Sequence, residues 1–283
     1  MTDFPALSWP APAKINLFLP VIGRRQDGFH NIQTLFQLLD WGDEIQISPT
    51  PGPAISRAPA NYGVEESQDL VVRAARLLQA VTGCRQGAEI EVKKRVPPGS
   101  GLGGGSSDAA TVLLVLNRLW GCGLGLDELA GLGRTLGADV PVFIQGHSAM
   151  AAGIGDILEP VNLGERQYLL VFPGMTISTA QVFSDAELPR DSREISLAGA
   201  LAGEGRNDCE LVVRKRFPEF ARVIEALREW GNPVMTGTGS AIFIAMNDRK
   251  SAKSAAKEMK TLYNVRAVRG VDRSTLRERL DSC

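Results

Sequence analysis

Alternating apolar and polar residues recur in short stretches along the chain, a pattern typical of strands that bury one face. The stretches that carry it span residues 11–20, 41–48, 88–94, 167–171 and 265–271. Apolar residues three or four positions apart, or almost continuous apolar runs, indicate helices between these strands. The segments concerned are 69–81, 108–120, 127–136, 219–230 and 251–262. Together the two patterns predict an α+β fold.

The length of the chain is sufficient for two domains. Its 283 residues are 44% hydrophobic and 22% charged, which is typical of a globular protein with a sizeable core. We expect an N-terminal domain over residues 1–155 and a C-terminal domain of α/β-sandwich type over residues 156–283. A cleft between the two domains is the expected place for a site.

Pro97–Ser107 stands out because five of its eleven residues are glycine. It lies between the predicted strand 88–94 and the predicted helix 108–120, and Ser106 and Ser107 are candidate N-caps of that helix. Glycines let an anion approach the backbone, and the first N–H groups of a helix have no internal partner. Because the helix dipole adds positive potential there, this arrangement favours a phosphate-binding loop over a surface turn.

The loop does not match the common phosphate loops. Gly99, Gly101 and Gly104 have the spacing of the dinucleotide fingerprint, but no strand ending in an acidic residue follows about 20 residues later. No Gly-Lys-Ser/Thr follows the glycines, and the His-Arg-Asp and Asp-Phe-Gly elements of protein kinases are missing from the sequence. The residues alone therefore leave a nucleotide or another phosphate compound as the ligand.

Composition and charge argue against several other classes of protein. The net charge is −1, so we expect no nucleic-acid or anionic-membrane partner. Four cysteines without paired spacing and only two histidines argue against a zinc site and favour reduced thiols. The first residues lack a signal-peptide pattern and no apolar run reaches 18 residues, so we expect a cytoplasmic location.

Residues 97–110 resemble the phosphate-binding motif of the GHMP kinases, a superfamily that includes galactokinase, homoserine kinase and mevalonate kinase. The resemblance implies that the N-terminal domain binds ATP together with Mg²⁺. It assigns no metal ligand, although Ser106 is a candidate by analogy. The loop residues implied to bind the nucleotide are Pro97, Pro98, Gly99, Ser100, Gly101, Leu102, Gly103, Gly104, Gly105, Ser106 and Ser107.

Two more residues are implied to lie near the nucleotide. By residue type alone Asp69 is the cap of the predicted helix, whereas GHMP relatives usually have Asn there, near the adenine. Lys94 ends the predicted strand that enters the loop and matches a family lysine near the nucleotide. For Lys94, a solvent-exposed position and a place beside the nucleotide are equally open interpretations.

Lys14 and Asn16 share one face of the first predicted strand, which by itself is typical of a solvated sheet surface. With residues 23–30, this strand is similar to the opening of the GHMP kinases that phosphorylate a cytidine-diphosphate ester of methylerythritol in the non-mevalonate isoprenoid pathway. The similarity implies that Phe29 stacks on the cytosine and that His30 hydrogen-bonds to it. Tyr is more usual in that family where this chain has Phe29.

Other segments match the same family. Residues 177–183 resemble the segment whose aromatic covers the second face of the cytosine, which implies a sandwich of the base between Phe29 and Phe183. Without that match, a lone Phe is more often a core residue. Residues 235–243 resemble the third GHMP motif. The substrate-binding residues implied by these matches are Asn16, Phe29, His30, Asp139, Thr179, Phe183 and Gly239.

Residues 137–143 match the Gly-Ala-Asp-Val-Pro motif of the family, whose Asp is the catalytic carboxylate. The match implies that Asp139 is the general base and that Lys14 stabilises the charge beside it. By residue type alone, Asp139 is a turn residue before a proline, or an acid poorly placed at the end of the predicted helix 127–136.

The sequence therefore predicts ATP-dependent phosphorylation of the 2-hydroxyl of the cytidylyl substrate, by a monomer or a homodimer. Another small-molecule kinase of the superfamily is one alternative, and Phe29, His30 and Phe183 argue against it. A non-catalytic nucleotide-binding module is the other, and the presence of both Lys14 and Asp139 argues against that.

Overall fold

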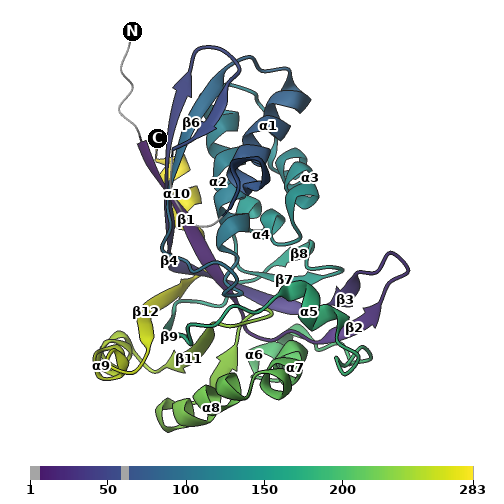
Figure 1. Ribbon diagram of the computed structural model, residues 1–283, viewed down its shortest axis with the longest axis vertical. Helices are drawn as coiled ribbons and strands as arrows, with labels where there is room; N and C mark the ends of the chain where they lie inside the picture. The colour runs from purple at the N-terminus through teal and green to yellow at the C-terminus, as the bar shows by residue number, and fades with distance from the viewer. Residues whose placement is uncertain (1–6, 59–63, 283) are drawn as a thin grey trace.

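The computed structural model describes residues 7–58 and 64–282. Within these residues a ten-stranded sheet runs in the order β10-β11-β9-β12-β4-β6-β5, with β1 and β7 also paired to β4 and β8 paired to β7 (Figure 1). Strands β2 and β3 form a separate hairpin. The strands are β1 (Leu7–Asn16), β2 (Val21–Arg24), β3 (His30–Ile32), β4 (Thr34–Thr50), β5 (Ile55–Arg57), β6 (Gly87–Lys93), β7 (Ala149–Ala152), β8 (Ile157–Pro160), β9 (Arg166–Phe172), β10 (Pro233–Met235), β11 (Ile242–Met246) and β12 (Asn264–Val271).

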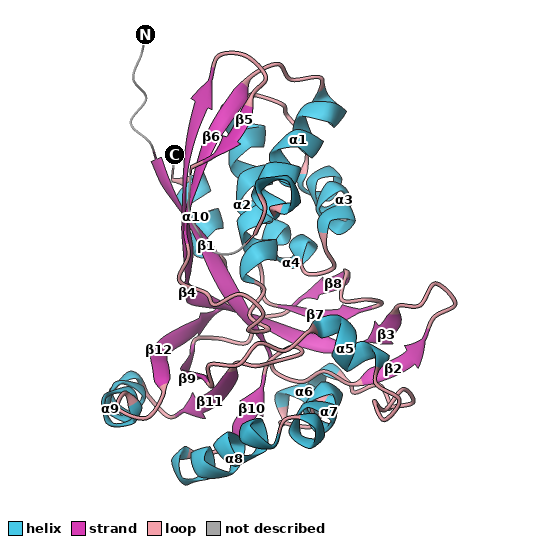
Figure 2. Ribbon diagram, in the orientation of Figure 1, coloured by secondary structure: helices cyan, strands magenta, loops and turns pink. Residues whose placement is uncertain are grey.

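Helices accompany the sheet in both halves of the molecule. In Figure 2, α1 to α4 gather beside the upper part of the sheet, and α7, α8 and α9 lie around the lower part. The helices are α1 (Leu70–Thr82), α2 (Gly104–Leu119), α3 (Leu126–Leu136), α4 (Val140–Gln145), α5 (Thr179–Ser184), α6 (Leu197–Leu201), α7 (Asp208–Arg216), α8 (Pro218–Leu227), α9 (Arg249–Met259) and α10 (Thr275–Asp281), with short 3₁₀ helices η1 (Glu66–Gln68) and η2 (Arg228–Trp230). The predicted α+β class is confirmed.

Strand β4 joins the two halves, because along its 17 residues it pairs with β1, β6, β7 and β12. In the N-terminal half, β1, β4 and β6 pack with α1, α2 and α4 in one apolar cluster. In the C-terminal half, β9 and β11 pack with α7, α8 and α9 in a second cluster. Burial of these two apolar clusters is the main stabilising contribution, since apolar area removed from water contributes about 25 cal/mol per Å².

The end of the chain returns to the N-terminal half. Strand β12 pairs antiparallel with β4, Gly270 opposite Leu39 and Val271 opposite Leu38. The guanidinium of Arg118 in α2 donates to the carbonyl oxygen of Leu280 in α10 at 2.5 Å. The sheet is thus continuous across both halves, and the predicted boundary at residue 155 stays a prediction.

Two strand boundaries differ from the sequence prediction. Strand β1 ends at Asn16 instead of near residue 20. Leu19 does not pair with β4, because its backbone hydrogen-bonds instead to Arg206 and Asp208. Strand β4 begins at Thr34 instead of near residue 41. Its first six residues are buried on both faces, so they show no alternation from which a half-buried strand could be recognised.

Helix α2 begins at Gly104, four residues before the predicted start. Its N-cap is Gly103, which has a left-handed φ of 73° and no side-chain cap. Ser106 and Ser107 lie inside the first turn, so their prediction as N-caps is wrong. The loop glycines turn the chain into the helix earlier than residues with side chains could, because left-handed backbone costs a residue with a Cβ roughly 1–2 kcal/mol.

Candidate active site

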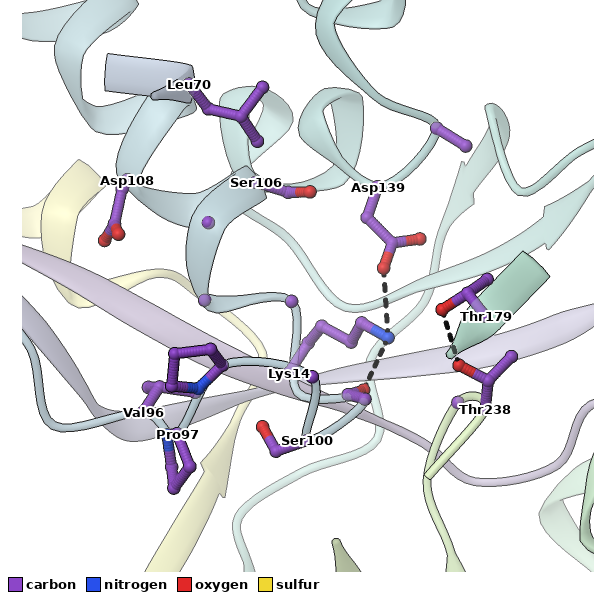
Figure 3. Close-up of a pocket in the computed structure, with 18 of the residues that line it drawn as sticks. Lys14, Leu70, Val96, Pro97, Ser100, Ser106, Asp108, Asp139, Thr179 and Thr238 are labelled. Carbon is purple, nitrogen blue, oxygen red and sulfur yellow. Dashed lines mark hydrogen bonds and ion pairs between the residues drawn. The ribbon is translucent and has the colours of Figure 1, made fainter. Parts of the chain in front are cut away.

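A cavity of about 510 Å³ lies where the two halves meet (Figure 3). Its walls come from β1, the start of α1, the glycine loop with the start of α2, the turn before α4, helix α5 and the loop before β11. The predicted nucleotide and substrate residues are spread between positions 14 and 239, yet most of them line this one space. The predicted cleft is therefore present. We call the part of the cavity at the glycine loop the phosphate end, and the region of Phe183 with the neighbouring Phe29 and His30 the base end.

The phosphate end comprises the glycine loop, Lys14 and Asp139. Gly99, Gly101 and Gly103 have φ values of 67°, 77° and 73°, which explains why glycine is needed at these positions. A Cβ on Gly101 would lie 2.2 Å from the carbonyl oxygen of Thr236. The loop thus packs closely against residues 235–243, the segment that resembles the third GHMP motif.

Helix α2 points its N-terminus into the phosphate end. It runs for 16 residues from Gly104, and no side chain caps it. Unpaired N–H groups and the positive end of the dipole therefore face the cavity, a combination that binds anions. Most of the predicted loop residues line the cavity, whereas Leu102 and Ser107 are fully buried and are not among its lining residues. Their predicted contact with the nucleotide stays a prediction.

Lys14 and Asp139 form an ion pair, with 3.1 Å between Nζ and Oδ2 (Figure 3). The ammonium also donates to Oδ1 of Asn16 at 2.6 Å and to the carbonyl oxygen of Gly101 at 3.0 Å. The Lys14 side chain is only 3% exposed, so the solvated-surface interpretation of the first strand is wrong. These contacts fix the cation beside the carboxylate and directly behind the glycine loop.

Asp139 occupies the N-cap position of α4, and its side chain makes no cap hydrogen bond. Helix α3 ends at Leu136, as predicted, and Asp139 lies between this C-terminus and the first residue of α4. The N-terminus of a helix favours negative charge. The Asp139 side chain is 32% exposed and faces the cavity, so it is available to a bound hydroxyl.

Asn16 is buried beside this pair. Its Nδ2 donates to Oγ1 of Thr34 at 2.9 Å, and its backbone N–H donates to Oγ1 of Thr236 at 2.8 Å. Across the cavity, the hydroxyls of Thr179 and Thr238 are 2.8 Å apart. The loop before β11 is therefore hydrogen-bonded to β1 through Thr236 and to α5 through Thr238. Gly239 of the same loop also lines the cavity.

The base end comprises Phe29, His30 and Phe183. The ring of His30 stacks on Phe183, with 5.3 Å between ring centroids and 27° between planes. Phe183 lines the cavity, whereas Phe29 is 59% exposed at the tip of the β2–β3 hairpin and neither Phe29 nor His30 is among the lining residues. The structure thus brings together His30 and Phe183, and the predicted sandwich by Phe29 stays a prediction.

Arg190 is a residue of the base end that sequence reasoning missed. Its Nε donates to Nε2 of His30 at 3.0 Å. Burial, together with the positive charges of Arg190 and Arg24, lowers the pKa of His30 below its usual 6.5. No short motif marks Arg190, because its partner is 160 positions away.

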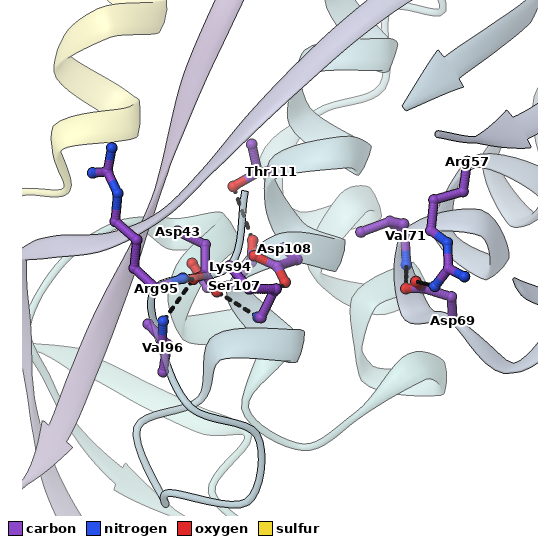
Figure 4. Close-up of polar contacts among 10 residues, drawn as sticks. All are labelled: Asp43, Arg57, Asp69, Val71, Lys94, Arg95, Val96, Ser107, Asp108 and Thr111. Carbon is purple, nitrogen blue, oxygen red and sulfur yellow. Dashed lines mark hydrogen bonds and ion pairs between the residues drawn. The ribbon is translucent and has the colours of Figure 1, made fainter. Parts of the chain in front are cut away.

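Lys94 is held in a buried cluster at the entrance of the glycine loop (Figure 4). Its Nζ lies 2.5 Å from Oδ2 of Asp43 and 2.8 Å from Oδ2 of Asp108. Oδ1 of Asp43 accepts hydrogen bonds from the backbone N–H groups of Arg95 and Val96, at 2.5 and 2.7 Å. Asp43 thereby anchors the first residues of the loop, and Lys94 joins it to the start of α2.

Sequence reasoning missed Asp43 and Asp108: Asp43 is one of several acids between residues 40 and 44, whereas Asp108 is a lone carboxylate before an apolar run. Burial raises the pKa of Asp108 to about 7 against the opposing effect of Lys94. The Lys94 side chain is only 16% exposed and is paired with both carboxylates, so the solvent-exposed interpretation of Lys94 is wrong. Its contact with a nucleotide stays a prediction.

Asp69 caps helix α1, as its residue type predicted. Oδ1 accepts from the N–H of Val71 at 3.0 Å, and Oδ2 pairs with the guanidinium of Arg57 at 2.5 Å (Figure 4). Asp69 also lines the cavity, next to the start of α1. Its predicted place beside the adenine stays a prediction.

Comparison with known proteins defines the class. The family described as the GHMP kinases N terminal domain matches residues 69–147, and GHMP kinases C terminal matches residues 187–265. A crystal structure of mevalonate kinase shares the fold, with a TM-score of 0.71 at 16% identity over 94% of this chain and 100% of that chain. The fold is that of a GHMP kinase, as predicted.

Two relatives narrow the assignment. A 4-diphosphocytidyl-2-C-methyl-D-erythritol kinase from Halorhodospira halophila (strain DSM 244 / SL1) is 49% identical over 271 residues, which cover 95% of this chain and 94% of the relative. A crystal structure of 4-(cytidine 5'-diphospho)-2C-methyl-D-erythritol kinase has a TM-score of 0.82 at 34% identity, over 94% of this chain and 100% of that chain. The chain belongs to the family of 4-diphosphocytidyl-2-C-methyl-D-erythritol kinases.

In the part of the chain that the structure describes, no helix combines the length and the apolar character needed to cross a membrane. The predicted cytoplasmic location stays a prediction, as does the choice between a monomer and a homodimer.

Proposed function

We propose that this protein transfers the γ-phosphoryl group of ATP to the 2-hydroxyl of 4-diphosphocytidyl-2-C-methyl-D-erythritol, giving the 2-phosphate. The observation that carries the proposal is the Lys14–Asp139 pair in the same cavity as the uncapped N-terminus of α2. This step belongs to the non-mevalonate route to isoprenoid precursors. The membership of the family described above supports the choice of substrate.

The glycine loop and the start of α2 hold the phosphates of ATP. The backbone N–H groups there donate to the phosphate oxygens, and the helix dipole favours their negative charge. Phosphoryl transfer depends mainly on positioning and on charge neutralisation. The close packing of Gly101 against Thr236 keeps the loop in one place, so the γ-phosphoryl group meets the acceptor in one orientation.

Asp139 accepts the proton of the substrate hydroxyl as the oxygen attacks the γ-phosphorus. The ammonium of Lys14 lies 3.1 Å from this carboxylate and stabilises the negative charge that develops on the attacking oxygen. Because Lys14 is also bound to Asn16 and to the Gly101 carbonyl, it stays in place while the carboxylate changes protonation state. Ordinary general-base catalysis contributes 10²–10⁴-fold, which is the share assigned here to Asp139.

The donor set of the cavity fits Mg²⁺ bound mainly through the nucleotide. Among the described residues, no group of three or more His, Cys, Asp or Glu side chains could hold a metal by itself. Mg²⁺ keeps several waters and uses few protein ligands beside substrate phosphates. The hydroxyl of Ser106, which lines the cavity, fits as one such ligand. When bound, the ion neutralises charge on the phosphates.

The base end holds the cytosine of the substrate. Phe183 offers an aromatic face to the cavity, and Phe29 on the β2–β3 hairpin supplies the second face. Stacking on one aromatic contributes roughly 1–3 kcal/mol per base in single-strand nucleic-acid binders. His30 lies against Phe183 and contributes a hydrogen bond to the edge of the cytosine ring.

The test is phosphoryl transfer with three acceptors. The protein is incubated with ATP, Mg²⁺ and the cytidylyl substrate, and in parallel with mevalonate and with homoserine. ADP release is followed, and the product is identified by phosphorus NMR. A new phosphomonoester on the cytidylyl substrate alone is the expected result. Transfer to mevalonate or homoserine would indicate another GHMP kinase, and ATP binding without any transfer would refute the kinase assignment.

A further inference from the structure

Arg190 makes four hydrogen bonds behind Phe183, at the base end. Its Nε donates to Nε2 of His30 at 3.0 Å. Its Nη1 donates to the carbonyl oxygen of Leu188 at 3.0 Å. Its Nη2 donates to the carbonyl oxygens of Phe183 at 3.1 Å and Asp185 at 2.7 Å. One guanidinium therefore ties the imidazole on β3 to the end of helix α5.

This arrangement determines the protonation of His30. A guanidinium carries only donors and stays charged at all accessible pH values. Nε2 of His30 must therefore be the acceptor, and in the neutral imidazole the proton resides on Nδ1. A proton on Nε2 would remove the hydrogen bond and place two cations side by side, so the neutral form is favoured.

The Nδ1–H of His30 is then a spare donor. No described residue accepts from it, while the opposite nitrogen is occupied by Arg190. The ring stacks on Phe183, a lining residue of the cavity, and His30 is only 8% exposed. Nδ1 is not among the buried polar atoms without a partner, so this N–H is accessible, and an acceptor on a ligand can hydrogen-bond to it.

We propose that Arg190 is a positioning residue for the pyrimidine base: it fixes His30 as the neutral Nδ1–H tautomer and holds the end of α5 that carries Phe183 against it. The stacking face and the donor then keep one geometry toward an acceptor atom of the ring. The identity of the base rests on the proposed function, whereas the state of His30 does not.

The charged groups around His30 agree with a neutral imidazole. Arg190 faces it from the segment after α5, and Arg24 is its cross-strand partner on β2. Helix α5 contributes the uncharged ring of Phe183. The nearby carboxylate of Asp185 forms an ion pair with Arg216, with 2.7 Å between Oδ2 and Nε. Burial and the two arginines lower the pKa of His30 from 6.5, so the ring stays neutral at neutral pH.

The first experiment is nitrogen-15 NMR of the two histidines in the full-length protein without ligands, with His147→Gln to assign the signals. We expect His30 as the Nδ1–H tautomer, with a titration midpoint below 6.5. In Arg190→Ala the midpoint moves upward and the tautomer preference is lost. A wild-type His30 that is mainly the Nε2–H tautomer would overturn the proposal without any need for a variant.

The second experiment compares Michaelis constants for the two substrates. Arg190→Ala is expected to raise the KM for the cytidylyl substrate about tenfold, through loss of one ordered hydrogen bond. The KM for ATP and kcat change less than about twofold, because the phosphate end keeps its contacts. Arg190→Lys keeps the charge but not the planar set of donors, so it gives an intermediate KM.

The matched control is Arg222→Ala. This exposed arginine on α8 pairs with Glu219 and is not among the partners of His30, so its loss should leave the His30 spectrum and both KM values unchanged. An equal rise in both KM values of Arg190→Ala, or no rise in either, would contradict the positioning role. If the NMR spectra are as expected but no phosphoryl transfer occurs, only the proposed function is refuted. If transfer occurs but His30 is the Nε2–H tautomer, only the role of Arg190 is refuted.

Discussion

At the phosphate end of the cavity, the Lys14 side chain is 3% exposed and lies on β1 in the main sheet. At the base end, Phe29 is 59% exposed and lies beside His30 on the β2–β3 hairpin, which is separate from that sheet. The first end is held by strand pairing and by a glycine loop packed against backbone. The second is held by side-chain contacts between segments about 160 residues apart.

This difference in how the two ends are held matches the positional precision that each proposed role requires. Transfer of a phosphoryl group requires the reacting atoms within a few tenths of an ångström, so misplacement by about 1 Å costs roughly 10²-fold in rate. Stacking of a base tolerates larger shifts, because each aromatic ring offers a broad face. Under the proposed function, backbone packing therefore positions the reacting groups, and side-chain contacts position the base.

The comparison is tested most strongly at Asp139. We expect Asp139→Asn to lower kcat by 10²–10⁴-fold, since the amide cannot accept the hydroxyl proton. Nucleotide affinity, measured by calorimetry, should stay nearly constant. Asp127→Asn, at an exposed acid in the first turn of α3, serves as the control. Unchanged turnover in Asp139→Asn would remove this residue from the mechanism.

The rigidity of the phosphate end is tested at Gly101. In Gly101→Ala the new Cβ would lie 2.2 Å from the Thr236 carbonyl oxygen, at a φ of 77°. We expect a loss of about 3 kcal/mol in the free energy of unfolding and a higher KM for ATP.

Gly121→Ala is the matched control for Gly101→Ala, with a φ of 66° and nothing within 4 Å of the new Cβ. It should lose only the roughly 1–2 kcal/mol of left-handed strain. Denaturant titration of both variants separates the close contact from the strain, and equal losses would show that the loop is free to move.

The base end is tested at Phe183. Phe183→Leu keeps apolar volume and removes the aromatic face, so we expect the KM for the cytidylyl substrate to rise about tenfold with kcat little changed. Phe29→Leu should raise the same KM without changing the free energy of unfolding, because Phe29 is exposed. A fall in kcat as large as the rise in KM would mean that the two ends are mechanically coupled.

The smallest expected effect concerns Asp108. Its pKa is raised from 3.8 to about 7, so between these values the folded state holds a proton that the unfolded state has lost. Wild-type stability therefore falls as the pH rises through this range. Asp108→Asn removes the titration, and its stability relative to wild type should increase by on the order of 1 kcal/mol between pH 5 and pH 8. Parallel stability curves for the two proteins would contradict this account.

Local patterns were sufficient for much of the phosphate end. Alternation predicted β6, the apolar run predicted most of α2, and the glycines between them predicted the anion-binding loop. These features depend on residues close together in the chain, where period and backbone freedom act directly. Asp69 as the cap of α1 is another such case, because the capped N–H belongs to a residue two positions away.

The first part of β4 could not be predicted because it is buried on both faces and shows no alternation. The contacts of single polar residues could not be predicted because their partners are distant in the chain. Lys14 carried the pattern of a solvated face, yet the sheet and the glycine loop enclose it.

What the sequence determined by itself is therefore the α+β class, the glycine loop between β6 and α2 and, through resemblance, the kinase family. The resemblance also implied that Lys14 lies beside Asp139, and the structure has this ion pair. Only the tertiary structure decided that Asp43 and Asp108 share Lys94 and that Arg190 reaches His30. The physical reason is that periodicity and capping act over a few residues. An ion pair or a hydrogen bond between distant segments exists only once the sheet has brought both partners out of water and into contact.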